Sequence, residues 1–198
     1  TGEVSELLKG PANTGVTVTV KRGEDTLQFS LNRKKISLKN VPFYGKLDEQ
    51  TGYIKLSDFT TNASAEVRNA LVSLKAQGAT QLVLDLRDNP GGLINEAVEI
   101  VNLFVPKGKE VVKTIGKLQQ VNYTYKTNKT PVDTKIGIIV LINDRSASAA
   151  EIVAGALQDY DRAVLLGQKS FGKGLVQTTL PLSFNAQIKV TTAKYYIP

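Results

Sequence analysis

Cysteine and histidine are both absent from this sequence of 198 residues, and each absence excludes several kinds of site. Without cysteine there is no disulfide, no thiolate metal site and no cysteine nucleophile. Without histidine there is neither a Ser-His-Asp triad nor an H-E-x-x-H zinc site. A hydrolase built from this chain would therefore use Lys, Asp, Glu, Tyr or an N-terminal amine as its general base.

Long apolar runs and a recognisable signal peptide are absent as well. No stretch approaches the length of about 20 apolar residues that a membrane-spanning helix needs. The chain has no Met and stops at Pro198 directly after a strand-like segment, so we expect both ends to be cuts within a longer protein. Its composition, 41% hydrophobic and 22% charged residues, is typical of a globular domain with a sizeable core.

The chain is basic, with a net charge of +7 and a pI of about 9.5. Such a charge would suit nucleic acid, and Arg33, Lys34 and Lys35 form a short basic run. The lysines are nevertheless spread along the whole chain, without the interleaved aromatic residues of a nucleic-acid-binding module. We therefore interpret the charge as a solvated basic surface and expect no nucleic-acid partner.

From residue 52 onward, the hydrophobic pattern predicts an α/β fold, a mostly parallel sheet with helices packed on it. Continuous apolar runs at 81–87 and 135–143 are typical of buried parallel strands. Apolar residues at helical spacing predict helices that begin near residues 64, 93 and 148, the first with Asn62 or Ser64 as its N-cap. The remaining predicted strands are 52–59, 163–167, 175–182 and 186–197.

The segment upstream of this core has different patterns. Residues 3–9 predict a short helix, and 16–23 and 26–33 alternate in the manner of a β-hairpin. Residues 35–51, which include Pro42, have the character of a connector. We therefore expect a small N-terminal element that is separate from the core.

The stretch GQKSFGKGLVQ (167–177) is similar to a phosphate-binding loop of the form G-x-x-x-x-G-K-[ST]. Gly174, however, stands where such a loop needs Ser or Thr to bind Mg²⁺. A strand-like segment also follows Lys173, where the loop needs a helix N-terminus. We therefore expect no bound nucleotide, and Lys173 is either an exposed cation between two turn glycines or a group with other chemistry.

The segment NDRSASAAEIV (143–153) leads from a predicted buried strand into a predicted helix. A serine in such a turn lies at a helix N-terminus, where free N–H groups and the helix dipole favour a developing negative charge. Ser148, between the small residues Ala147 and Ala149, is thus a candidate nucleophile. The alternative is that Ser146 or Ser148 is simply the N-cap of the helix.

Two further segments offer compatible chemistry. DNPGG (88–92) is again a turn between a strand and a helix, and its glycines would let backbone N–H groups point at a substrate carbonyl oxygen. The alternative is an ordinary Pro-Gly turn. The second segment places Lys173 between Gly172 and Gly174 at the start of a strand. A lysine held in a tight, partly apolar pocket has a lowered pKa, which makes its neutral amine available as a base.

Together these segments resemble the carboxy-terminal processing peptidases, or tail-specific proteases, which are serine endopeptidases with a Ser-Lys dyad. The resemblance covers nearly the whole chain and implies a crotonase/ClpP-like protease core. It also implies hydrolysis of peptide bonds through an acyl-enzyme, without metal or cofactor. The matching blocks, in the family's order, are TGYIKLSDF, LVLDLRDNPGGL, EAVEIVNLFVPKG, VLINDRSASAAEIVAGALQD and GQKSFGKGLVQ.

The resemblance implies roles for individual residues. Ser148, the second serine of S-A-S-A, takes the place of the nucleophile, and Lys173 of F-G-K-G that of its base. Gln177, four residues after this lysine, would help to orient it.

The implied oxyanion hole consists of backbone N–H groups on two different segments. One N–H belongs to Ala149, directly after the nucleophile, and the other to Gly91 or Gly92 of the N-P-G-G turn. The family often has Ser where this chain has Ala150, a small change that we expect to be tolerated.

The family also carries a PDZ domain upstream of its protease core. The implied organisation is a C-terminal PDZ-like fragment (1–34), a connector (35–51) and a serine protease core (52–198) that is truncated at its C-terminal end. A polypeptide substrate, often engaged near an unstructured C-terminus, and a bacterial periplasmic or cell-envelope location are implied as well. Membrane association through an upstream segment and homo-oligomerisation are further expectations. The alternative is a catalytically silent module that holds extended peptides by strand addition.

Overall fold

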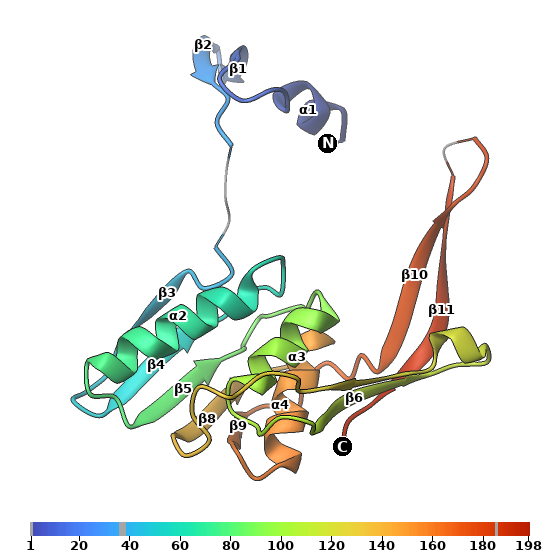
Figure 1. The fold of residues 1–198 in the computed structure, drawn as a ribbon. Coiled ribbons are helices and arrows are strands. Elements are labelled where there is room, and N and C mark those ends of the chain that lie inside the picture. Colours follow the sequence, from blue (N-terminus) through green and yellow to red (C-terminus); the bar gives the residue numbers. More distant parts are fainter. Residues whose placement is uncertain (1, 36–38, 185) are drawn as a thin grey trace. The chain divides into compact units, whose positions relative to one another are not determined.

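The computed structural model describes residues 2–35, 39–184 and 186–198, which belong to two compact units, 1–38 and 39–198 (Figure 1). Part of the predicted connector, 36–38, lies outside the described residues. The rest of it contains strand β3 (Phe43–Lys46), which the sequence pattern did not predict. A strand this short, with a glycine inside it and a proline just before it, has too little periodicity to be recognised.

The first unit contains helix α1 (Gly2–Leu8) and a hairpin of strands β1 (Gly15–Arg22) and β2 (Asp25–Asn32), which confirms the predicted helix and hairpin. Arg33 joins the helix to the hairpin. Its guanidinium donates hydrogen bonds to the carbonyl oxygens of Leu7 and Leu8 in the last turn of α1. It also donates to the carbonyl oxygen of Gly15, at the start of β1. A cation in this position interacts favourably with the helix dipole.

The second unit is built on a sheet with the strand order β3-β4-β5-β8-β9. Strands β4, β5, β8 and β9 run parallel, as predicted, and β3 is antiparallel to β4 at one edge. Each successive parallel strand lies on the same side of the one before it, from β4 through β5 and β8 to β9. Right-handed crossovers therefore place all the connecting helices on the same face of the sheet. The bounds are Thr51–Lys55 (β4), Gln81–Asp85 (β5), Gly137–Ile142 (β8) and Val164–Gly167 (β9).

The helices on this face are α2 (Ala63–Ala76), α3 (Ile94–Asn102) and α4 (Ala149–Asp159), with α3 in contact with both others (Figure 1). They begin where the apolar spacing predicts, and Asn62 is the N-cap of α2. Between helices and sheet lies a core of fully buried side chains that includes Ile54, Leu71, Leu84, Val101, Val140 and Val153. On the opposite face of the sheet, Ile139, Val164 and Leu166 are exposed.

A second sheet, with the order β10-β11-β6-β7, is antiparallel. The sequence pattern predicted the strands at 175–182 and 186–197 but not that they belong to a separate antiparallel sheet. Only residues 182–186 separate β10 from β11, too few for the crossover that parallel pairing requires. The bounds are Glu110–Ile115 (β6), Tyr123–Lys126 (β7), Leu175–Pro181 (β10) and Gln187–Tyr196 (β11), with a 3₁₀ turn at Gln119–Val121.

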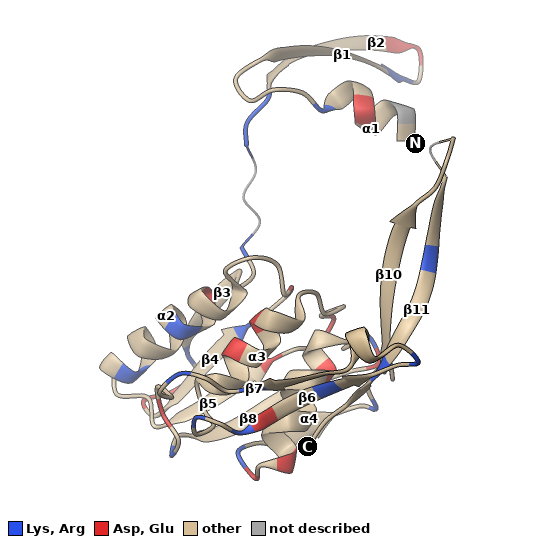
Figure 2. Cartoon of the chain, turned by 45° about the vertical axis from the view of Figure 1, so that its right-hand side comes forward, with Lys and Arg blue, Asp and Glu red and all other residues tan. Residues whose placement is uncertain are grey.

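The basic residues occur in both units, and Figure 2 shows them on α2, β6 and β11 and in several loops. Some form surface ion pairs, such as Lys113 with Glu110 (2.8 Å) and Lys129 with Glu99 (2.7 Å), which contribute little to stability. No helix in the described part of the chain is both long and apolar enough to span a bilayer.

Candidate active site

The predicted site segments follow the C-terminal ends of neighbouring strands. The DNPGG turn follows β5, the Ser148 turn follows β8, and the Lys173 loop follows β9. Strand β8 pairs in parallel with both β5 and β9. Parallel strands have their C-terminal ends at the same edge of the sheet, where α/β proteins usually place their sites. The fold therefore brings these segments together.

Ser148 is the N-cap residue of α4, but its backbone is not that of an ordinary N-cap. Its φ of 56° and ψ of −115° lie outside the extended region that N-cap residues normally adopt. Such a conformation costs a non-glycine residue about 1–3 kcal/mol and persists only where the surroundings impose it, most often at functional sites. Helix capping alone therefore does not explain the half-buried Ser148, which stays the candidate nucleophile.

Ser146, the other serine of this turn, has a different environment. Its side chain is fully buried, and its Oγ donates a hydrogen bond to the carbonyl oxygen of Leu86 (2.8 Å). The Ser146 Oγ also accepts a hydrogen bond from the backbone N–H of Asn143 (3.0 Å). These bonds tie the turn after β8 to the segment after β5. Ser146 is thus a structural residue that a substrate cannot reach.

Gly91 brings the DNPGG turn against Ser148. A Cβ atom at Gly91 would lie 2.8 Å from the Cβ of Ser148 and 2.8 Å from the backbone nitrogen of Ala149. It would also lie 2.6 Å from the carbonyl oxygen of Ala147. With a φ of 94° as well, only glycine fits here. The Gly91 N–H is not free, since it donates to Oδ1 of Asn89 (2.8 Å).

Gly92 also has a positive φ, 146°, but differs from Gly91 in its neighbours and in its N–H. A Cβ there would lie 2.5 Å from the carbonyl oxygen of Phe59, and no acceptor for the Gly92 N–H is found among the described residues. The N–H of Ala149, in the first turn of α4, likewise has no intrahelical partner. Of the two glycine N–H groups, only that of Gly91 is engaged in a hydrogen bond among the described residues, so Gly91 would have to release Asn89 before it donated to an oxyanion.

Asn89 was not predicted as a site residue, yet it organises this turn. It is fully buried, and its Nδ2 donates to the carbonyl oxygen of Leu56, after β4 (2.8 Å). The backbone carbonyl oxygen of Asn89 accepts a hydrogen bond from the N–H of Ala147 (2.9 Å). Asn89 thus connects β4, the glycine turn and the Ser148 turn through one residue.

Lys173 is half-buried in the loop between β9 and β10. The backbone N–H of Lys173 donates to the carboxylate of Glu151 (2.9 Å). The same carboxylate accepts the backbone N–H of Ser148 (2.7 Å). Gln177 lies exposed in β10, where the register with β11 shifts. Within the described residues, no hydrogen bond joins the side chains of Ser148, Lys173 and Gln177. Glu151 was not predicted, although the S-x-x-E pattern of a capping box from Ser148 was a signal for it.

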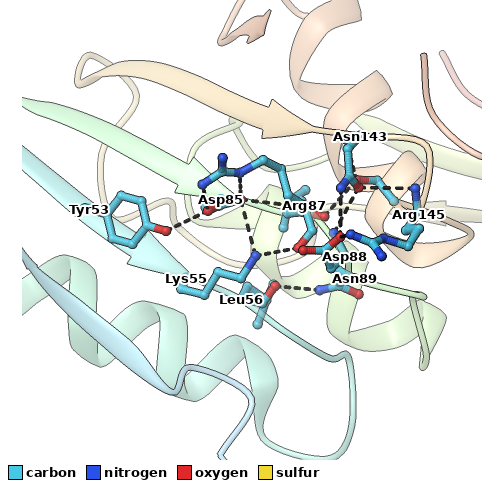
Figure 3. A network of polar contacts seen from close by, with 11 residues as sticks. Tyr53, Lys55, Leu56, Asp85, Arg87, Asp88, Asn89, Asn143 and Arg145 are labelled. Carbon is cyan, nitrogen blue, oxygen red and sulfur yellow. Dashed lines mark hydrogen bonds and ion pairs between the residues drawn. The ribbon is translucent and has the colours of Figure 1, made fainter. Parts of the chain in front are cut away.

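A network of charged side chains lies beside these turns (Figure 3). Its centre is Asp85, buried at the end of β5, which accepts hydrogen bonds from the Tyr53 hydroxyl (2.6 Å) and the Arg87 guanidinium (2.6 and 3.0 Å). Lys55 forms a further ion pair with it (3.4 Å). Burial raises the pKa of Asp85, but the hydrogen bonds from Arg87 and Tyr53 outweigh it, so the pKa lies well below its ordinary value. Asp85 is therefore a charged structural anchor.

Asp88 extends this network from the turn after β5 to the turn after β8. It accepts a hydrogen bond from the Asn143 amide (2.8 Å) and pairs with Arg145 (2.5 Å). The hydrogen bond from Asn143 lowers the pKa of Asp88. Over the described ranges, no cluster of three or more acidic side chains is arranged to hold a metal ion.

Known proteins match this chain over most of its length. The profile of peptidase family S41 matches residues 50–198. A probable CtpA-like serine protease of Staphylococcus aureus is 39% identical over 197 residues, which cover 99% of this chain and 39% of that protein. A carboxyl-terminal-processing protease of Synechocystis sp. is 41% identical over 203 residues, which cover 99% of this chain and 46% of that protein. The chain thus spans less than half the length of either relative.

A solved structure agrees with these relatives. The photosystem II D1 C-terminal processing protease superposes with a TM-score of 0.68 at 33% sequence identity, over 98% of this chain and 54% of that chain. Sequence profile, relatives and fold lead to the same assignment. The chain belongs to peptidase family S41.

Proposed function

We propose that this chain carries the catalytic core of a serine endopeptidase that hydrolyses peptide bonds near the C-termini of polypeptides. The family and the names of the relatives, a CtpA-like serine protease and a carboxyl-terminal-processing protease, support this reaction and substrate. The observation that carries the proposal is the strained backbone of Ser148 at the N-terminus of α4, packed against Gly91. A nucleophile held rigidly at a helix N-terminus suits a reaction that develops negative charge.

The proposed reaction begins when the neutral amine of Lys173 accepts the proton of Ser148 as Oγ attacks the scissile carbonyl carbon. The N–H groups of Ala149 and of Gly91 or Gly92 donate to the resulting oxyanion, and each contributes about 3–4 kcal/mol. The Lys173 ammonium then protonates the leaving amine, and the C–N bond breaks to leave an acyl-enzyme. Lys173 next takes a proton from water as the water oxygen attacks the ester carbonyl carbon, and it returns this proton to Ser148 Oγ when the ester C–O bond breaks. These steps need neither metal nor cofactor.

The remaining roles in this proposal rest on the resemblance to the family. Gln177 orients Lys173 at the start of β10, and residues 1–34 are the last part of a PDZ domain. The order of α1, β1 and β2 supports the latter assignment. We place the protein in the bacterial periplasm or cell envelope, with membrane association and homo-oligomerisation as properties of the whole protein.

A second candidate function is peptide binding without cleavage. Strand β10 lies at an edge of the second sheet and begins two residues after Lys173. An extended peptide could pair with this edge by strand addition. The same edge would also serve to align a substrate, so it is compatible with both functions.

Labelling with a fluorophosphonate, which reacts with activated serines, tests the proposal on the whole protein. We expect one label, located at Ser148 by peptide mass spectrometry, and loss of both the label and peptide cleavage in Ser148→Ala. Absence of labelling together with retained binding of an unstructured peptide would reject the protease and favour the silent binding module.

A further inference from the structure

The Glu151 carboxylate, in the first turn of α4, accepts hydrogen bonds from both segments that carry the proposed dyad. Its Oε2 accepts the backbone N–H of Ser148 (2.7 Å) and that of Lys173 (2.9 Å). Its Oε1 accepts the hydroxyl of Ser170 (2.7 Å) and the N–H of Gly172 (2.6 Å). A single atom, Oε2, therefore joins the backbones of the two residues that must exchange a proton.

These contacts are the strong kind of hydrogen bond, because the acceptor is a carboxylate. Hydrogen bonds to an ionised group are shorter and about twice as strong as those between neutral groups. A capping box uses only the bond to the N-cap residue, here Ser148, and so accounts for only one of the four. The other three reach out of the helix to the loop of residues 170–173, which a purely local capping role does not explain.

The loop of Lys173 has few other attachments. The N–H of Phe171 donates to the carbonyl oxygen of Ser146 (3.0 Å). The N–H of Tyr195 donates to the carbonyl oxygen of Gly174 (2.9 Å). The side chain of Phe171 is 65% exposed, so apolar burial does not secure the loop. Segments with so few buried contacts open easily. The carboxylate is thus the principal anchor that holds this loop against the start of α4.

We propose that Glu151 is a positioning residue that sets the distance between Ser148 and Lys173. The inference rests on the proposed Ser-Lys mechanism, and Glu151 acts through the dyad without contacting the substrate. Glutamine has one acceptor oxygen and an NH₂ group where Glu151 has two acceptor oxygens. In Glu151→Gln, two of the four donors would therefore face another donor, and the loop would move away from Ser148.

The test measures kcat and KM for an unstructured peptide with the whole protein. Since a misplacement of about 1 Å costs roughly 100-fold in rate, we expect Glu151→Gln to lower kcat by about 100-fold, with KM within about threefold. Glu151→Asp keeps the charge on a shorter side chain, and we expect partial recovery of kcat. If Glu151 only stabilised the fold, the folded variant would not show a large loss of kcat at a nearly unchanged KM.

Glu96→Gln is the matched control. The Glu96 carboxylate likewise accepts backbone N–H groups at the start of a helix, those of Asn62 (3.0 Å) and Ser64 (2.7 Å) at α2, outside the proposed dyad. We expect this variant to lose stability and to keep its kcat. An equal loss of kcat in Glu96→Gln, or a folded Glu151→Gln variant with kcat within about twofold of the parent, would overturn the proposal.

Ser170→Ala covers the case in which Glu151→Gln fails to fold. It removes one donor to Oε1 and leaves the carboxylate in place, so we expect a several-fold lower kcat and a native melting curve. An unchanged kcat would then contradict the proposal. Ser148→Ala in the same assay separates this inference from the proposed function: retained cleavage in that variant would refute the mechanism itself, whatever the Glu151 variants do.

Discussion

Gly91→Ala tests the contact on which the proposed site depends, and Gly78→Ala is its control. Gly91 has a φ of 94° and Gly78 a φ of 91°, so both substitutions place an alanine at nearly the same unfavourable φ. At Gly78 nothing lies within 4 Å of an added Cβ, whereas at Gly91 the Cβ would lie 2.6–2.8 Å from atoms of the Ser148 turn. The difference between the two variants therefore isolates the contact with the nucleophile.

The expected losses of unfolding free energy follow from the unfavourable φ and from the contact of the added Cβ with the Ser148 turn. A positive φ costs an alanine about 1–2 kcal/mol, which is the whole expected loss in Gly78→Ala. Gly91→Ala adds about 1–3 kcal/mol for overpacking, because the nearest atoms are two backbone atoms and the Cβ of Ser148, none of which can rotate away. Activity should separate the variants further. A shift of the Ser148 turn by about 1 Å would lower kcat/KM by roughly 100-fold, and Gly78→Ala should leave it unchanged.

Urea unfolding and cleavage of an unstructured peptide measure these effects on the whole protein. The unfolding midpoint should fall more in Gly91→Ala than in Gly78→Ala, with unchanged slopes. Equal losses of stability in the two variants, with full activity in Gly91→Ala, would refute the reasoning, since Gly91 could not then be packed against the nucleophile.

Three further predictions concern single residues. Ser148→Ala should abolish cleavage with unchanged melting, whereas Ser146→Ala should cost about 1–3 kcal/mol in unfolding free energy and keep part of the activity; the reverse ranking would identify the wrong nucleophile. Lys173→Arg should be as inactive as Lys173→Ala in the cleavage assay, because guanidinium keeps its proton; substantial cleavage would mean that Lys173 supplies only charge. Burial raises the pKa of Asp133, but the hydrogen bond from Lys75 outweighs it and lowers the pKa to about 2. The stability from this pair, about 1–2 kcal/mol, should be present above pH ~4 and disappear as the pH falls toward 2. Lys75→Ala should weaken that acid dependence in unfolding curves, and the N–H groups of Lys135 and Ile136, which also donate to Asp133, should preserve the rest of it; an unchanged curve would contradict the role of Lys75.

The sequence alone determined the features that depend on local pattern. Helix starts near 64, 93 and 148 follow from apolar spacing and small polar residues, and 81–87 and 135–143 are recognisable as buried strands because they are continuously apolar. The motifs around Ser148 and Lys173 were equally visible, since a strand followed by a turn and a helix is a local signal. The family could be inferred for the same reason.

Tertiary structure decided which side chains are accessible and which distant segments meet. The sequence favoured Ser148 over Ser146 through its small neighbours and the family resemblance, but only the structure shows that Ser146 is fully buried and that the backbone of Ser148 is strained. The bonds from Glu151 to the loop of Lys173 span about 20 residues of chain and exist only because parallel strands place their C-terminal ends at one edge. The short connection between 175–182 and 186–197 was a signal for antiparallel pairing, but the pairing of β11 with β6, far earlier in the chain, could not be predicted from the residues of either strand. Local periodicity carries no information on such contacts between distant segments.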